Sequence, residues 1–183
     1  MPRTEVIFTG FGGQGIVLSG IILARAAVHD GKEVVQSQSY GPEARGGACL
    51  AEVIISDGNV YYPFVEEADI LVAMSQEALD KYINNVKEGG RVIVDTDTIS
   101  RIPQKAGVKL DKVTATGIAS EKLGKIIVAN IVMLGALTSL TGIVNKTAME
   151  KAVRESIPPG TEDINLKALE AGYYNSQQDE REE

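Results

Sequence analysis

A cluster of glycines near the N-terminus is the part of the chain whose residue types and spacing most favour ligand binding. Gly10-Phe11-Gly12-Gly13-Gln14-Gly15 follows a short apolar segment and precedes a segment with apolar residues at helical spacing. In such a strand–turn–helix, the glycines permit a tight turn, a close approach of the backbone to an anion, and close packing of helix on strand. The start of the helix offers free N–H groups and a partial positive charge to a phosphate. The residues predicted to form this binding turn are Gly10, Gly12, Gly13, Gln14 and Gly15.

Three interpretations of the turn remain open from the residues alone. A dinucleotide site would need an acidic residue about twenty positions on, at the end of the second strand. That segment ends in Gln36-Ser37-Gln38, and Glu33 stands at its beginning instead. The turn could also serve only to pack a strand on a helix, or it could meet another phosphate, a cofactor edge or the backbone of a partner.

A second loop, Ser39 to Gly47, is rich in residues that form turns. Because it follows the second predicted strand, we expect it at the same end of the sheet as the first glycine turn. Its arginine offers a planar fork of donors for a phosphate or a carboxylate, although its two charges could also simply be solvated. The residues predicted to share a binding or interface region with the first turn are Gly41, Pro42, Glu43, Arg45, Gly46 and Gly47.

Side chains for catalysis or metal binding are scarce. With one cysteine, Cys49, and one histidine, His29, the chain supplies neither a thiolate cluster nor a histidine-rich metal site. Asp95 and Asp97 could bind a metal, but we expect them to form a solvated strand terminus. The chain is therefore predicted to hold no catalytic residue and no metal of its own.

The hydrophobic pattern predicts strands alternating with helices, which is typical of βαβ units on a mostly parallel sheet. A hairpin is expected across Asp57-Gly58-Asn59, and the last third of the chain is predicted to be helical. The fold class is thus α/β, with a Rossmann-like, mostly parallel sheet, flanking helices and one β-hairpin. The predicted strands are 6–9, 33–37, 48–56, 60–64, 69–74, 91–95 and 108–114, and the predicted helices are 16–29, 75–87, 120–140, 146–156 and 161–173. Residues 1–176 are expected to form a single domain, and 177–183 an acidic, frayed tail.

Composition narrows the function further. The 183 residues are 44% hydrophobic and 23% charged, which is ordinary for one globular domain. A net charge of -7 argues against nucleic acid as a partner. Residues 126–145 are uncharged and long enough to cross a bilayer, but Asn130 and other polar side chains interrupt them. We therefore expect a buried helix, with Asn130 hydrogen-bonded because an unpaired buried amide is costly, and no membrane contact. No leader is recognised at the N-terminus, and a cytoplasmic location is expected.

The two glycine-rich motifs, together with Asn130 and Leu134-Gly135-Ala136, resemble the gamma subunit of 2-oxoacid:ferredoxin oxidoreductases. The resemblance covers Glu5 to Tyr174, and Phe11, Tyr40 and Gly47 are more similar to the 2-oxoglutarate type than to the pyruvate type.

The resemblance implies a non-catalytic subunit of a complex that oxidatively decarboxylates a 2-oxoacid with coenzyme A, yielding acyl-CoA, CO2 and reduced ferredoxin. It implies alpha, beta and ferredoxin-like delta subunits as partners, and ferredoxin as electron acceptor. Thiamine diphosphate, Mg2+ and 4Fe-4S clusters would lie in those partners, and the isolated chain would be inactive. The alternative is a free-standing nucleotide-binding α/β protein, either dehydrogenase-like or regulatory.

Overall fold

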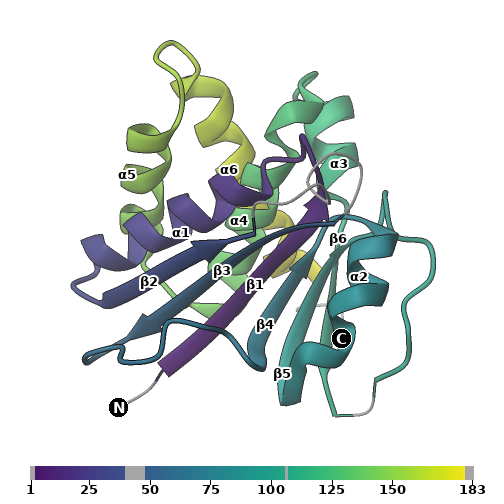
Figure 1. Ribbon diagram of the computed structural model, residues 1–183. Helices are drawn as coiled ribbons and strands as arrows, with labels where there is room; N and C mark the ends of the chain where they lie inside the picture. The colour runs from purple at the N-terminus through teal and green to yellow at the C-terminus, as the bar shows by residue number, and fades with distance from the viewer. Residues whose placement is uncertain (1–2, 40–47, 106, 180–183) are drawn as a thin grey trace.

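A twisted six-stranded sheet forms the centre of the computed structural model, which describes residues 3–39, 48–105 and 107–179 (Figure 1). Within these residues the strand order is β2-β3-β1-β4-β5-β6. The strands are β1 (Arg3–Phe11), β2 (Glu33–Gln38), β3 (Ala48–Ser56), β4 (Ala68–Ala73), β5 (Val86–Asp95) and β6 (Lys109–Val113). The expected α/β class with a mostly parallel sheet is confirmed, since β1, β4, β5 and β6 run in the same direction.

The antiparallel part of the sheet differs from the expectation. β3 lies between β1 and β2 and is antiparallel to both, whereas residues 60–64 form no strand. The predicted hairpin across residues 57–59 is therefore wrong. The physical reason is that β1 and β2 already occupy both edges of β3, and Pro63 has no N–H to donate to a strand ladder.

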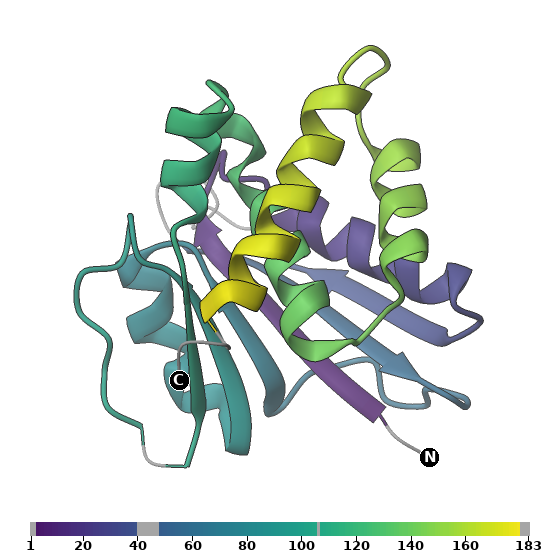
Figure 2. The ribbon, with the colours of Figure 1, turned by 180° about the vertical axis from the view of Figure 1, so that it is seen from behind.

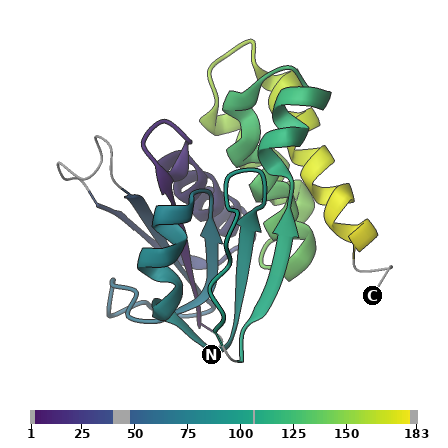
Figure 3. The same cartoon turned by 90° about the vertical axis from the view of Figure 1, so that its right-hand side faces the viewer.

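Helices cover both faces of the sheet, and Figure 2 shows the more heavily covered face. On that face α1 packs on β2 and β3, and the C-terminal helices pack on α1 and on each other. The opposite face carries α2 and the short turn η2, seen beside the strands in Figure 3. The helices are α1 (Ile16–His29), α2 (Gln76–Tyr82), η2 (Ile83–Asn85), α3 (Ala115–Gly117), η3 (Ile118–Lys122), η4 (Ile126–Val128), α4 (Ala129–Thr141), α5 (Lys146–Ser156) and α6 (Glu162–Asp179).

The helices α2 and α5 differ in how their first turns are capped. Ser75 precedes α2, and its hydroxyl accepts a hydrogen bond from the Ala78 N–H, as a capping serine should. Asn145 precedes α5, but its side chain makes no capping bond and donates instead to Asp30.

The helix predicted over residues 120–140 is interrupted. Gly124 has a φ of 66°, which a continuing helix cannot accommodate, and the chain turns there before η4 and α4. From Ala129 to Thr138 every residue of α4 is buried within the fold, so the expectation of a buried helix is confirmed for α4. Throughout the described part of the chain, no helix combines the length and the apolar composition that a membrane crossing requires.

α4 and α6 cross at two glycines with almost no side chain between them. A Cβ on Gly135 would lie 2.0 Å from the Leu169 carbonyl oxygen, and one on Gly172 would lie 1.9 Å from the Val132 carbonyl oxygen. These distances explain why glycine stands at both positions: the two backbones themselves are in contact.

Candidate functional site at the carboxyl edge of the sheet

The glycine turn, defined here as residues 10–15, lies at the topological switch point of the sheet, the place where the chain leaves two neighbouring parallel strands toward opposite faces. After β1 the chain enters α1 on one face, whereas after the neighbouring β4 it enters α2 on the other face. The carboxyl ends of β1 and β4 therefore lead to opposite sides of the sheet. In open α/β sheets this is the position at which ligands bind.

Gln14 holds the turn together from within. Its Oε1 accepts a hydrogen bond of 2.6 Å from the Phe11 N–H, and its Nε2 donates one of 2.7 Å to the Met74 carbonyl at the end of β4. Met74 in turn donates its N–H to the Thr9 carbonyl at 2.9 Å. One side chain thus fixes the turn to both strands of the switch point.

Gly15 has two reasons to be glycine. Its φ of 74° lies in the left-handed region, and a Cβ there would stand 2.4 Å from Nδ2 of Asn130. That same Nδ2 donates to the Gly15 carbonyl at 3.2 Å, and Asn130 is 2% exposed. The prediction that Asn130 is buried and hydrogen-bonded is confirmed, and its partner is the turn itself.

The other turn residues are placed as a binding turn requires. Gly12 and Gly13 are exposed, and a Cβ on Gly13 would meet no atom of the described residues within 4 Å, although its φ is 95°. A Cβ on Gly10 would lie 2.5 Å from Oε1 of Gln14. Beyond the turn, the first N–H groups of α1 have no acceptor within their own helix. The turn can therefore present backbone donors outward to an anion.

The second predicted loop falls almost entirely outside the described residues, and its candidates Gly41, Pro42, Glu43, Arg45, Gly46 and Gly47 are among those not described. The strands on both sides of it are described. Gln38 at the end of β2 pairs with Ala51, and Ala48 at the start of β3 pairs with Phe11 in the turn region. Both flanks thus lie at the carboxyl edge that bears the glycine turn, as the sequence predicted.

The expectation that Asp95, at the carboxyl end of β5, is solvated is wrong. Asp95 is fully buried. Its carboxylate accepts from the Thr116 hydroxyl at 2.5 Å and from the Asp97 N–H at 3.2 Å. Burial raises the pKa of Asp95 above its ordinary value, and these hydrogen bonds offset only part of that effect. Its contacts join β5 to α3, so we assign it a structural role. Asp97 is exposed, as expected.

Exposed apolar side chains lie at the same edge, a feature that the sequence patterns did not separate from the core. Phe11 is 42% exposed, and Ile126 and Ile127 in η4 are 63% and 74% exposed. η4 leads directly into α4, whose Asn130 contacts the glycine turn. The edge therefore offers backbone donors together with apolar surface, which suits an extended ligand or another protein chain.

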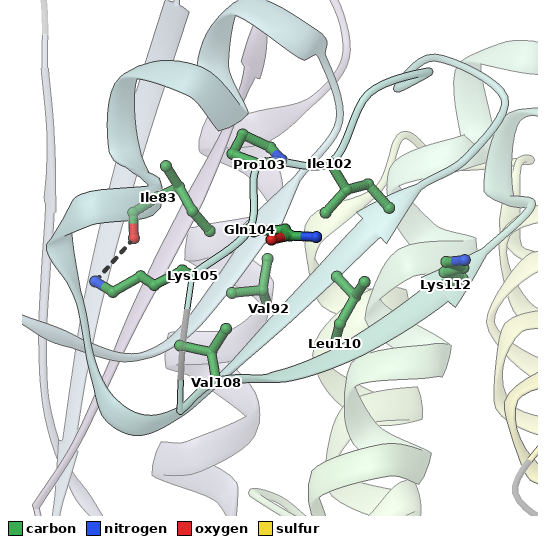
Figure 4. Close-up of a pocket in the computed structure, with 9 residues that line it drawn as sticks. All are labelled: Ile83, Val92, Ile102, Pro103, Gln104, Lys105, Val108, Leu110 and Lys112. Atoms are coloured by element: carbon green, nitrogen blue, oxygen red, sulfur yellow. Dashed lines mark hydrogen bonds between the residues drawn. The ribbon is translucent and has the colours of Figure 1, made fainter.

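An apolar hollow also lies on the α2 face, between β5, β6 and the segment before β6 (Figure 4). Lys105 donates to the Ile83 carbonyl at 3.1 Å and to the Asn84 carbonyl at 2.9 Å, so its ammonium closes η2 rather than facing the hollow. The described residues that line the hollow include no paired acid and base. They are Ile83, Val92, Ile102, Pro103, Gln104, Lys105, Val108, Leu110 and Lys112. We therefore place the candidate site at the glycine turn.

Fold and turn together define an α/β protein with a nucleotide-type glycine turn at its switch point. The family described as pyruvate ferredoxin/flavodoxin oxidoreductase matches residues 5–174, and the chain belongs to that family.

Two archaeal relatives are named 2-oxoglutarate synthase subunit KorC. The one from Methanocaldococcus jannaschii is 56% identical over 174 residues, which are 93% of this chain and 92% of the relative. The one from Methanothermobacter thermautotrophicus is 51% identical over 176 residues, 93% of each. These names agree with the 2-oxoglutarate-type resemblance.

Two solved structures share the fold. The keto/oxoacid ferredoxin oxidoreductase gamma subunit from Geobacter sulfurreducens has a TM-score of 0.87 at 45% identity, covering 96% of this chain and 99% of that one. The 2-oxoglutarate:ferredoxin oxidoreductase from Magnetococcus marinus, solved with 2-oxoglutarate, coenzyme A and succinyl-CoA bound, has a TM-score of 0.86 at 21% identity. It covers 97% of this chain and 32% of that one. The expectation of a gamma subunit of a 2-oxoacid:ferredoxin oxidoreductase is confirmed, and the free-standing alternative is not supported.

Proposed function

We propose that this chain is the gamma subunit of a complex that oxidises 2-oxoglutarate, with coenzyme A as co-substrate and ferredoxin as electron acceptor. The observation that carries the choice of 2-oxoacid is the identity of 50% or more, over nearly the whole chain, to relatives named 2-oxoglutarate synthase subunits. The expected partners are alpha, beta and ferredoxin-like delta subunits.

The reactive groups of such a complex belong to those partners. Cys49 is the one cysteine of the chain. It lies on β3, packed against the core, so a 4Fe-4S cluster, which needs four thiolates, does not fit this subunit. Thiamine diphosphate and Mg2+ are likewise assigned to the partner subunits. This chain contributes shape and backbone donors rather than a reacting side chain.

We further propose that the glycine turn and the loop containing Arg45 face the phosphates of coenzyme A in the assembled complex. In support, exposed glycines and the first N–H groups of α1, which have no acceptor within their own helix, lie together at the switch point of the sheet. The flanks of the second loop reach the same edge. The competing role for this edge is contact with a partner subunit alone.

Position 13 allows a matched test of these two roles. Gly13 is exposed, and among the described residues no atom lies near its missing Cβ. Gly13→Asn and Gly13→Asp impose similar backbone strain and differ mainly in one charge. If the turn faces coenzyme A phosphates, Gly13→Asp raises the KM for coenzyme A well above that of Gly13→Asn at similar kcat. Equal KM values would assign the edge to subunit contact.

The substrate is tested with the assembled complex. The chain is co-expressed with the alpha, beta and delta subunits and purified, and ferredoxin reduction is followed with several 2-oxoacids. The proposal expects coenzyme A-dependent activity with the highest kcat/KM for 2-oxoglutarate. A preference for pyruvate or a branched 2-oxoacid would refute the substrate assignment while leaving the family unchanged.

A further inference from the structure

The segment between β3 and β4, residues 57–67, carries a dense group of exposed aromatic side chains and is called the aromatic loop below. Tyr61 is 88% exposed, Phe64 58% and Tyr62 50%. The whole chain holds six Tyr, three Phe and no Trp. Three of these nine aromatic residues are therefore exposed close together, between positions 61 and 64. Tyrosine and phenylalanine are enriched in the buried centres of protein interfaces, and exposure of this kind indicates a contact surface.

The aromatic loop lies at the sheet end opposite to the glycine turn. Ser56, just before the loop, pairs with Arg3 at the beginning of β1, whereas the glycine turn follows the end of β1. A partner on the loop would therefore bind apart from the candidate coenzyme A edge.

The loop is held in place by the fold. The Arg3 guanidinium donates to the carbonyls of Tyr62 at 3.2 Å and Phe64 at 3.4 Å, and Val65 packs against the core on the α2 face. The rings of Tyr62 and Phe64 meet edge to face with centroids 5.6 Å apart. Because the backbone of the aromatic loop is already held by these contacts, the loop would lose little conformational entropy when a partner binds.

The charge around the rings restricts what can bind. Residues 57–67 contain three carboxylates and no lysine or arginine. Asp57 is paired with Lys32, Glu66 is exposed and accepts a hydrogen bond from the Tyr62 hydroxyl, and Glu67 is exposed. A second copy of this chain in a two-fold contact would bring the same carboxylates face to face, which is unfavourable. A complementary surface would instead offer an apolar recess with lysine or arginine at its rim.

We propose that the aromatic loop docks this chain onto another subunit of the same oxidoreductase complex, at an apolar recess with a basic rim. The proposal rests on the function proposed above.

The principal experiment measures assembly. Purified chain is titrated into a complex prepared without it, and the Kd is compared for wild type, the double variant Tyr61→Ser/Phe64→Ser and the control Val28→Ser. Val28 is 58% exposed, the same as Phe64, but lies on α1. We expect the double variant to raise the Kd roughly tenfold or more and the control to leave it unchanged. Thermal melting of each isolated variant should match wild type, because the altered side chains are exposed.

A second arm tests the charge. Glu66→Lys/Glu67→Lys should weaken assembly more than Glu66→Gln/Glu67→Gln, and the difference should shrink as salt is raised. Reversed charges that strengthen assembly or leave it unchanged would contradict a basic rim.

A third arm identifies the occupant. A photoreactive phenylalanine analogue at position 61 is illuminated in the assembled complex. A cross-link to a different subunit supports the proposal, and a cross-link to a second copy of this chain overturns it.

The outcomes separate this inference from the proposed function. If wild type assembles and Tyr61→Ser/Phe64→Ser assembles with the same Kd, the docking inference is overturned and the subunit assignment stands. If wild type binds no oxidoreductase subunit at all, the proposed function fails, and this inference fails with it.

Discussion

Gly15→Ala tests whether the glycine turn is fixed by Asn130 as well as by its own backbone. With a φ of 74°, an added Cβ costs about 1–2 kcal/mol in the left-handed region. The Cβ would also stand 2.4 Å from Nδ2 of Asn130, which must move and give up its bond to the Gly15 carbonyl. Leaving that buried amide unpaired costs about 1–3 kcal/mol. The free energy of unfolding should therefore fall by about 2–5 kcal/mol, or roughly 4–20 °C in Tm for a chain of this size.

Gly13→Ala is the matched control, because Gly13 also has a positive φ but, within the described part of the chain, has no atom within 4 Å of its missing Cβ. It should cost only the backbone strain of about 1–2 kcal/mol. Urea unfolding of the isolated chain measures both variants. Adding Asn130→Ala to Gly15→Ala should destabilise by less than the sum of the single changes, since the clash and the lost bond are shared. If Gly15→Ala costs no more than Gly13→Ala, or if the two changes simply add, the argument for a clash at Asn130 is refuted.

Three further predictions concern other parts of the chain. Burial raises the pKa of Asp95 above 3.8, so the folded chain favours the protonated carboxyl, and the stability that Asp95 contributes is lost as pH rises through the raised pKa. When unfolding is measured from pH 3.5 to 7, Asp95→Asn should therefore gain stability relative to wild type as pH rises. A constant difference in the free energy of unfolding would contradict this. Arg45→Ala should leave the Tm of the isolated chain nearly unchanged but raise the coenzyme A KM or weaken assembly of the complex by about 1.5–3 kcal/mol. Arg45→Lys should restore coenzyme A binding or assembly only in part. A large fall in Tm with normal kinetics would show that Arg45 has a structural role. The isolated chain, with its one cysteine, should be inactive and colourless after anaerobic iron–sulfur reconstitution, and a visible cluster absorption that stays with it through gel filtration would show the opposite.

Hydrophobic periodicity was sufficient to predict most elements of this fold. α1 (Ile16–His29) and β3 (Ala48–Ser56) have the predicted bounds, because each is a single apolar run between clear turn signals. Pairing was harder to foresee, since periodicity shows which residues face a core but not which strands are neighbours. The insertion of β3 between β1 and β2, and the resulting loss of a partner for residues 60–64, follow from tertiary packing alone.

The candidate site was predictable to a similar degree. Spacing alone placed the glycine turn between strand and helix, and buried Asn130 was expected to be hydrogen-bonded. That its partner would be Gly15, 115 positions away, could not be read from local patterns. The expectation of a solvated Asp95 is wrong: a strand end is normally solvated, whereas Asp95 is fully buried and accepts a hydrogen bond from Thr116 in α3.

The hydrogen bonds around Met74 also bear on how the site would respond to a ligand. The Met74 carbonyl accepts from Gln14 on one side and from Thr98, beyond β5, on the other at 2.9 Å. The glycine turn is thereby tied, through the residue that follows β4, to the segment after β5, and these bonds hold its conformation. A ligand that binds at the glycine turn would meet a preorganised surface, because the turn would lose little conformational entropy on binding. Selectivity here would depend on rigid fit, and small changes in β4 would alter affinity as directly as changes in the turn itself.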